Sequence, residues 1–263
     1  MKVSYFPGCT LKTKAKDLDK YARECAEVLG VTLEEIENWQ CCGGVFTTST
    51  DEIATKLSSV RALAEANKKG QSLVSVCSAC HNVLKQTNDA MKNNAEFAMH
   101  VNAYNKQNLS PDSEYNGETE VIHYLELLRD KIGFDKIKEK VVKPLEGKKV
   151  AAYYGCLLLR PGKVMAMDDV ENPSIMEDLI RALGGEPVIY AYRNECCGAY
   201  TTLESQTLAK AKSNKISINA KDKGAEVIVT ACPLCMYNLK KYGSEVPVLY
   251  VTELLAQALG VKE

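Results

Sequence analysis

The sequence lacks a long apolar stretch, an excess of charge of one sign and a signal peptide. No apolar run approaches the ~20 residues that cross a bilayer, so no direct membrane insertion is predicted. The formal net charge is −1 and the pI about 6.4, which gives no electrostatic reason to expect nucleic acid or an anionic membrane as a partner. The opening MKVSYFPGC has no basic region, apolar region or cleavage site. We therefore expect a cytoplasmic protein without a disulfide framework.

What the sequence does contain is cysteine, and ten of its eleven cysteines form a five-residue pattern that occurs twice. The first set is Cys9, Cys41, Cys42, Cys77 and Cys80, and the second is Cys156, Cys196, Cys197, Cys232 and Cys235. The gaps are 31, 0, 34 and 2 residues in the first set and 39, 0, 34 and 2 in the second. Because thiolate sulfur selects zinc, copper(I) or iron–sulfur clusters, each set is a candidate metal site.

Other uses of these cysteines agree less well with their number and spacing. Structural zinc takes four ligands, so five cysteines are too many for one ion. A thioredoxin-like pair could use Cys77 and Cys80, but it would leave the adjacent Cys41 and Cys42 without a purpose. The count and the spacing therefore favour a multi-iron cluster in each half.

Short β-branched or aromatic runs alternate with segments of helical period, a pattern typical of a parallel α/β sheet. The predicted strands are 2–7, 72–76, 149–154, 188–190 and 227–230, and the predicted helices are 17–29, 52–69, 79–92, 174–183, 203–221 and 234–241. The duplication predicts two domains, 1–148 and 149–263. In each, the cysteines fall at strand ends and in Gly-rich loops, where open parallel sheets place their ligand sites.

The two halves differ in length. Residues 121–128 resemble 248–255, and the change in spacing places about 28 additional residues in the first half, in an insertion near 91–120. Its polar character, with Ser110-Pro111 and Asn116-Gly117, predicts a surface loop. This loop is a candidate partner-binding arm.

The local words PGCT, CCGG and CSAC in the first half, and YGCL, CCGA and CPLC in the second, carry a family resemblance. Over nearly the whole chain, the doubled motif resembles the two CCG domains of the heterodisulfide reductase B-type proteins and their relatives. The resemblance implies an α/β fold with two Rossmann-like CCG domains related by internal duplication. It also implies that each five-cysteine set holds one non-cubane 4Fe–4S cluster.

The same resemblance implies a catalytic subunit that reduces a small-molecule disulfide, coenzyme M–coenzyme B disulfide or an analogue, between its two clusters. Electrons would come from a partner, because the chain has no Cys-x-x-Cys-x-x-Cys run for relay cubanes. In the family the partners are a ferredoxin-like C-type protein with cubane clusters and an A-type flavoprotein that bifurcates electrons.

The alternative is a non-catalytic electron-transfer CCG subunit of a lactate, glycolate or succinate oxidoreductase complex. The completeness of both motifs favours the catalytic interpretation, because a relay would tolerate one degraded site.

A few further residues have candidate roles. His81 follows Cys80 and is a candidate to donate a hydrogen bond to sulfur or a proton to a departing thiolate, the alternative being a position on the helix surface. His123 is predicted to be a hydrogen-bonded core residue. Cys25 lies on an apolar helical stripe and is predicted to be core. The candidates for steering an anionic disulfide are Lys12, Lys14, Lys16, Arg160 and Lys163.

Overall fold

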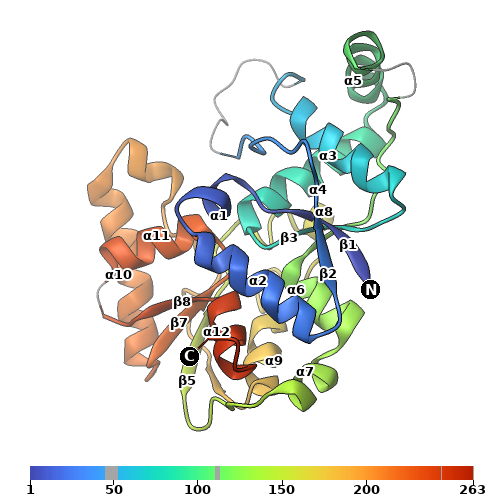
Figure 1. The fold of residues 1–263 in the computed structure, drawn as a ribbon. Coiled ribbons are helices and arrows are strands. Elements are labelled where there is room, and N and C mark those ends of the chain that lie inside the picture. Colours follow the sequence, from blue (N-terminus) through green and yellow to red (C-terminus); the bar gives the residue numbers. More distant parts are fainter. Residues whose placement is uncertain (45–52, 110–112, 244, 263) are drawn as a thin grey trace.

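The computed structural model describes residues 1–44, 53–109, 113–243 and 245–262, and it contains two four-stranded sheets (Figure 1). The first sheet has the order β2 (Thr32–Glu35), β1 (Lys2–Phe6), β3 (Leu73–Ser75), β4 (Val121–His123). The second has the order β6 (Glu186–Val188), β5 (Lys149–Tyr153), β7 (Val227–Thr230), β8 (Val248–Tyr250). All of these pairings are parallel. The predicted fold class, a duplicated Rossmann-like α/β unit, is confirmed.

Burial explains which runs form strands. Four of the five residues of β1 and all four of β7 are buried, as expected where helices cover both faces of a parallel sheet. The edge strand β2 has the sequence TLEE, in which only Leu33 is buried. Its polar composition is the reason that the apolar pattern did not predict this strand.

Each of the six helices that the sequence predicts is present, and the chain forms further helices besides them. In the first half they are α1 (Cys9–Thr13), α2 (Lys16–Val28), α3 (Leu57–Lys68), α4 (Ser78–Asn93), α5 (Ala95–Asn108), α6 (Tyr124–Glu126), the π-helical η1 (Leu127–Ile132) and α7 (Phe134–Lys140). In the second half they are α8 (Gly162–Met165), α9 (Ile175–Ala182), the 3-10 helix η2 (Tyr200–Leu203), α10 (Gln206–Asp222), α11 (Pro233–Tyr242) and α12 (Val251–Ala258).

Two helices begin later than predicted. Turns occupy residues 53–56 before α3, and Glu52, the predicted start, lies outside the described residues. The 3-10 helix η2 and the N-cap Ser205, whose side chain accepts a hydrogen bond from Leu208 N, precede α10.

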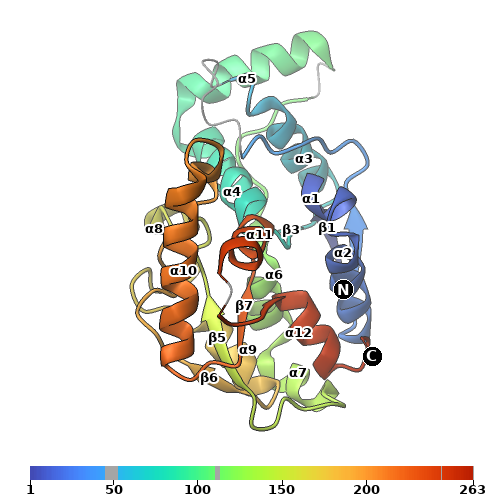
Figure 2. The ribbon, with the colours of Figure 1, turned by 90° about the vertical axis from the view of Figure 1, so that its left-hand side faces the viewer.

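The insertion near 91–120 is not the loop that was predicted. Asn94 caps α5 by accepting a hydrogen bond from Phe97 N at 3.0 Å, and the helix continues to Asn108. The prediction was wrong because the turn-forming residues lie at the C-terminal end of the insertion, whereas a cap and helix formers begin it. Ser110 and Pro111 lie outside the described residues. In Figures 1 and 2, α5 stands at the periphery of the molecule.

The two halves share a core because each supplies a helix to the other. Helix α12 of the second half packs against α2 of the first, where Thr252 Oγ1 donates a hydrogen bond to Leu18 O at 3.1 Å (Figures 1 and 2). Helix α7, at the end of the first half, packs against α9 of the second. One cluster of buried apolar side chains includes residues of both halves. Neither half therefore keeps its full core without the other.

The hydrogen bonds by which Asn102 anchors α5 to Tyr115 give a prediction for stability. The buried Asn102 side chain donates to Tyr115 O at 2.9 Å and accepts from Tyr115 N at 3.1 Å. We expect Asn102→Ala to lower the free energy of unfolding by about 1–3 kcal/mol, because two backbone groups lose their partner. Urea unfolding measures the loss. The control is Asn93→Ala, which removes an exposed hydrogen bond to Asp89 and should cost less than ~0.5 kcal/mol. Equal losses would show that Asn102 does not anchor the helix.

Candidate metal centre

The cysteines lie where the sheet order reverses. Cys9 follows β1 and Cys77 follows β3, adjacent strands whose onward connections run toward opposite edges of the sheet. In the second half, Cys156 and Cys232 follow β5 and β7 in the same way. The crevice at the carboxyl ends of such strands is where open parallel sheets bind ligands. The fold thus brings two cysteines of each set together.

The other members of the first set come from a loop and a helix. Cys41 and Cys42 stand in the loop before α3, and Cys80 stands in the first turn of α4. The Cys42 and Cys80 sulfurs are 3.5 Å apart, and the Cys9 and Cys41 sulfurs are 3.8 Å apart. Cys42, Cys77 and Cys80 are buried, whereas Cys9 and Cys41 are exposed. The first set therefore has a buried inner side and an outer side open to solvent.

The second set repeats this arrangement. Cys235 stands in the first turn of α11, with its sulfur 3.5 Å from that of Cys197. The buried members are Cys197, Cys232 and Cys235, and the half-buried ones are Cys156 and Cys196. All five line one cavity, which Ser78 of the first half also lines. The second set therefore reaches the interface between the halves.

The two Cys-x-x-Cys turns meet at that interface. The thiols of Cys77 and Cys232 are hydrogen-bonding neighbours, and this contact raises the pKa of Cys77. Ser78 donates to Ala231 O from its backbone N at 3.1 Å and from its hydroxyl at 2.8 Å. The Tyr250 hydroxyl lies 2.8 Å from Ala231 O and 2.8 Å from the carbonyl oxygen before Cys77. These bonds hold the two cysteine sets face to face.

Because the thiols pack closely and hydrogen-bond to one another, the pKa of some is lowered and the pKa of others is raised. The hydrogen bond from Cys41 lowers the pKa of Cys42 to about 3. The thiol of Cys235, with backbone N–H groups in the first turn of α11, holds the pKa of Cys232 well below its usual range. Hydrogen bonds to neighbouring thiols, together with burial, raise the pKa of Cys41 and Cys235. Each set thus contains a favoured thiolate, and loading a metal would release the remaining protons.

Two lysines that the sequence did not single out lie near these thiols. The charge of Lys56 acts on Cys42, and the charge of Lys212 acts on Cys196, whose pKa is lowered to about 6 chiefly by Cys156. Both lysines therefore favour thiolate. No sequence signal could have found them, because Lys and Arg together number 33.

His81 does not lie on the surface of its helix. Its side chain is fully buried, with Nε2 3.3 Å from Glu126 Oε2 and its ring centroid 5.4 Å from that of His123. Burial lowers the pKa of His81. The structure places His81 in a buried polar group next to Cys80, and its role toward sulfur stays a prediction.

The remaining sequence candidates divide into paired and exposed residues. Cys25 lies in the core, as predicted, and burial raises its pKa to about 12. Lys12 pairs with Glu35 at 2.6 Å, and Arg160 pairs with Glu171 at 3.0 Å. Lys14, Lys16 and Lys163 are exposed. These three lysines are therefore the better candidates for steering an anion.

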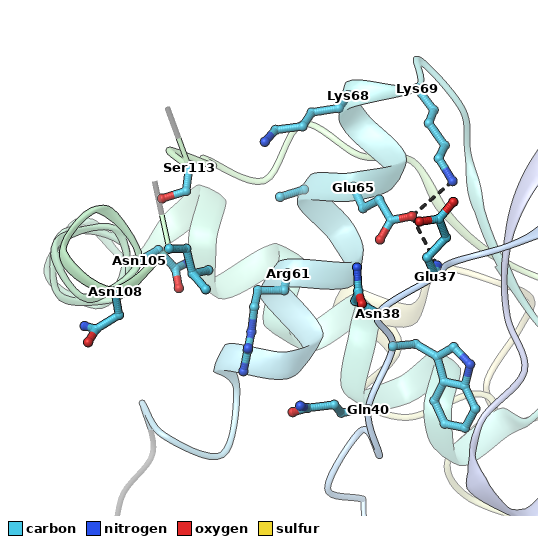
Figure 3. A pocket seen from close by; sticks show the side chains of 13 residues that line it. Glu37, Asn38, Gln40, Arg61, Glu65, Lys68, Lys69, Asn105, Asn108 and Ser113 are labelled. Carbon is cyan, nitrogen blue, oxygen red and sulfur yellow. Dashed lines mark hydrogen bonds and ion pairs between the residues drawn. The ribbon is translucent and has the colours of Figure 1, made fainter. Parts of the chain in front are cut away.

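A polar cavity of about 930 Å³ lies between α3, α5 and residues 37–40 (Figure 3). Glu65 crosses one side of it, pairing with Lys69 at 3.0 Å and accepting a hydrogen bond from Glu37 N at 3.2 Å. Its lining includes Gln40, the residue before Cys41, but no cysteine. This cavity is therefore separate from the thiol site.

The donors and the backbone fit a sulfur-ligated group in each half. A Cβ atom on Gly8 (φ +77°) would lie 2.7 Å from Cys80 Sγ, and one on Gly155 (φ +65°) would lie 3.1 Å from Cys235 Sγ. Only glycine permits this close approach of backbone to sulfur in the left-handed conformation. Among the residues that the structure describes, no three His, Cys, Asp or Glu side chains form a ready-made site for one ion.

The chain matches known proteins along its length. A model of the CCG cysteine-rich domain matches residues 3–85 and 150–240. The chain is 33% identical to the 8-methylmenaquinol:fumarate reductase membrane anchor subunit of Wolinella succinogenes, covering 98% of this chain and 92% of that protein. It is 30% identical to the B-type protein of the ferredoxin/F(420)H(2)-dependent CoB-CoM heterodisulfide reductase of Methanosarcina acetivorans, covering 98% and 89%. A heterodisulfide reductase B-like protein of Archaeoglobus profundus is 27% identical, with 99% and 91% covered.

A solved structure supports the fold. A hypothetical protein from Helicobacter pylori matches with a TM-score of 0.75 at 14% identity. The match covers 100% of this chain but only 49% of that one, so the chain spans about half of its length. Within the described residues, no helix has both the length and the apolar character needed to cross a membrane.

The contact between Gly8 and Cys80 gives a prediction with a matched control. Gly30 has nearly the same φ, +79° against +77°, but a Cβ there meets nothing within 4 Å. Both Gly→Ala variants should lose at least about 1–2 kcal/mol to backbone strain. Gly8→Ala should lose more than Gly30→Ala on this ground as well, because the ψ of Gly8 is 160°, in a region that only glycine readily occupies. Gly8→Ala should lose about 1–3 kcal/mol more, because its Cβ overlaps a packed sulfur. Urea unfolding of the two variants compares these losses. If they are equal, the backbone does not need to touch Cys80.

His123 gives a prediction for pH dependence. As predicted, it is a buried, hydrogen-bonded residue: Nδ1 accepts from Leu125 N at 3.2 Å, and Nε2 lies 3.1 Å from Val76 O. Burial lowers its pKa to about 3. The unfolded chain takes up this proton near pH 6.5, so the contribution of His123 is constant above that pH and stability falls as the pH drops from about 6.5 toward 3.

We expect His123→Gln to remove up to about 1.4 kcal/mol per pH unit from this slope. The free energy of unfolding, measured in urea between about pH 7.5 and about pH 4.5, tests the change. His100→Gln replaces an exposed histidine and should leave the slope as it is. A wild-type slope in His123→Gln would mean that other groups carry the pH dependence.

Proposed function

Because this chain belongs to the CCG cysteine-rich domain family that includes the heterodisulfide reductase B-type proteins, we propose that it is the iron–sulfur subunit of a heterodisulfide-reductase-like complex. Each five-cysteine set would hold one non-cubane 4Fe–4S cluster, and a small-molecule disulfide would be reduced between them. The observation that supports this proposal best is the meeting of the two sets at one interface, where Cys77 contacts Cys232.

Two facing centres suit this reaction because a disulfide takes up two electrons and two protons to give two thiols. Iron–sulfur clusters supply electrons one at a time, so two of them can supply the pair. The outer cysteines, Cys9, Cys41, Cys156 and Cys196, are exposed or half-buried. We therefore place the entry of the disulfide on this outer side. Coenzyme M–coenzyme B disulfide or an analogous compound would be the substrate.

The protein would hold the negative charge of the loaded sets through its backbone and two lysines. First-turn N–H groups of α11 favour the thiolate of Cys232, and Lys212 acts on Cys196. In the first half, Lys56 acts on Cys42. A helix N-terminus carries a partial positive charge, so both helices that begin at the interface add to this stabilisation.

Electrons would reach the chain from a partner protein. The sequence has no Cys-x-x-Cys-x-x-Cys run for a relay of its own. We propose a ferredoxin-like C-type partner with cubane clusters, supplied in turn by an A-type flavoprotein that bifurcates electrons.

A second candidate function is electron transfer without disulfide chemistry. The relative from Wolinella succinogenes, at 33% identity, is named as part of a reductase that uses 8-methylmenaquinol and fumarate. In this alternative the chain passes electrons between a flavoprotein and another acceptor, as CCG proteins of lactate, glycolate or succinate oxidoreductases do.

Metal content with electron paramagnetic resonance (EPR) tests the proposal. Anaerobically purified protein should contain about eight irons with matching acid-labile sulfide, and its paramagnetic signal should change when a thiol is added during a redox titration. Cys42→Ser should lose the iron of the first set alone, and Cys197→Ser that of the second. Cys25→Ala, outside both sets, should keep all of the iron.

Each other outcome has a distinct meaning. Two loaded clusters that respond to a quinol but not to thiols or disulfides would favour the electron-transfer function. Zinc in place of iron would contradict both functions. Loss of all iron from either serine variant would show that the ten cysteines form one shared site.

A further inference from the structure

Tyr200 connects the two adjacent-cysteine loops across the interface. It comes three residues after Cys197, at the start of η2, and its hydroxyl donates a hydrogen bond to Gly44 O at 2.5 Å. Gly44 comes two residues after Cys42 and packs against it, because a Cβ on Gly44 would lie 3.5 Å from Cys42 Sγ. One hydrogen bond therefore joins the loop of one cysteine pair to the loop of the other.

The segment that carries Tyr200 is itself held in place. Asn238 Nδ2 and Ser213 Oγ both donate to Cys197 O, each at 3.2 Å. Thr202 Oγ1 donates to Gly198 O at 3.1 Å. Because side chains of α10 and α11 fix this turn, the position of the Tyr200 hydroxyl is set by the second half of the chain.

Tyr200 also lies among thiols of both sets. It lines the cavity formed by the five cysteines of the second set. Burial, and after it the thiols of Cys232, Cys156, Cys42 and Cys77, raise the pKa of Tyr200. The hydroxyl therefore stays protonated and remains a donor. The Tyr200 side chain therefore lies near Cys156 of the second set and near Cys42 and Cys77 of the first.

The internal repeat shows that this contact is one-sided. In the internal repeat, residues 41–45 (CCGGV) align with residues 196–200 (CCGAY). Valine therefore stands in the first half where tyrosine stands in the second. Other hydrogen bonds across the interface, from Ser78 and Tyr250, join the Cys-x-x-Cys turns. Among the hydrogen bonds of the described residues, that of Tyr200 extends this connection to the loops of the adjacent pairs.

We propose that Tyr200 is a positioning residue that sets the separation between the two metal sites and thereby the width of the space that receives the disulfide. The inference rests on the proposed function, because it assumes that both sets are loaded. It adds a residue outside the cysteine motifs, and it predicts that removing a hydroxyl group of the second half changes the site in the first half.

Tyr200→Phe in the assembled complex tests this role, because it keeps the ring and removes only the hydroxyl. We expect full iron content and little change in the unfolding temperature. We also expect an altered EPR spectrum of the first site and a kcat/KM for the disulfide that falls about tenfold, which corresponds to about 1.4 kcal/mol of transition-state stabilisation. The matched control is Tyr237→Phe, which removes an exposed hydroxyl that accepts a hydrogen bond from Lys241 Nζ. It should change neither the EPR spectrum nor kcat/KM.

The outcomes separate the inference from the proposed function. Wild-type protein without iron, or with iron but without disulfide reduction, would contradict the proposed function. Wild-type activity with a Tyr200→Phe variant of the same spectrum and the same kcat/KM would overturn the inference alone. If Tyr200→Phe loses iron from the first site, the residue acts in assembling the site and not in spacing it, which also overturns the inference.

Discussion

The structure depends on the contact between two Cys-x-x-Cys turns. The carbonyl groups before Cys77 and Cys232 lie at the ends of central strands, and the hydroxyls of Ser78 and Tyr250 tie them together across the interface. A buried carbonyl without a partner is costly, so these bonds fix how the halves meet. Because both turns begin helices, their first-turn amides and their cysteines are brought to the same point. The Cys77 and Cys232 thiols therefore lie in contact at the interface.

The exchange of helices explains why the contact is stable. Helix α12 covers α2 of the first half and α7 packs on α9 of the second, so the apolar cluster continues through both sheets. Two independent domains joined by a linker would be free to separate at a polar, thiol-rich interface. Here the same apolar burial that stabilises each half also holds the two cysteine sets against each other. The architecture therefore suits a centre that needs two metal groups at a constant distance.

The duplication is broken at positions that face the centre. His123 and Tyr250 are equivalent in the repeat, yet only the tyrosine reaches the carbonyls of both halves. Tyr200 aligns with a valine, so its hydroxyl has no equivalent in the first half. These differences give the two sites unlike surroundings, although their ligand sets are alike. If both sets hold clusters as proposed, unlike surroundings would let the two differ in reduction potential, which would favour a direction of electron flow.

Sequence alone determined the fold class, the two sets of cysteines and the order of the strands and helices that it named, because ligand spacing and apolar periodicity are local properties of the chain. It did not name the short strands β4 and β8 or helices such as α7 and α12. The sequence pattern did not predict β2, because this edge strand is polar. It also did not predict α5, because turn residues at one end of the insertion suggested a loop. It also could not show that His81 is buried, that Tyr200 reaches Gly44, or that Lys56 and Lys212 act on thiols. Those facts depend on contacts between distant segments. Only tertiary packing decided them, within one half for His81, Lys56 and Lys212 and between the halves for Tyr200. The spacing of residues along a chain carries no record of which surfaces meet.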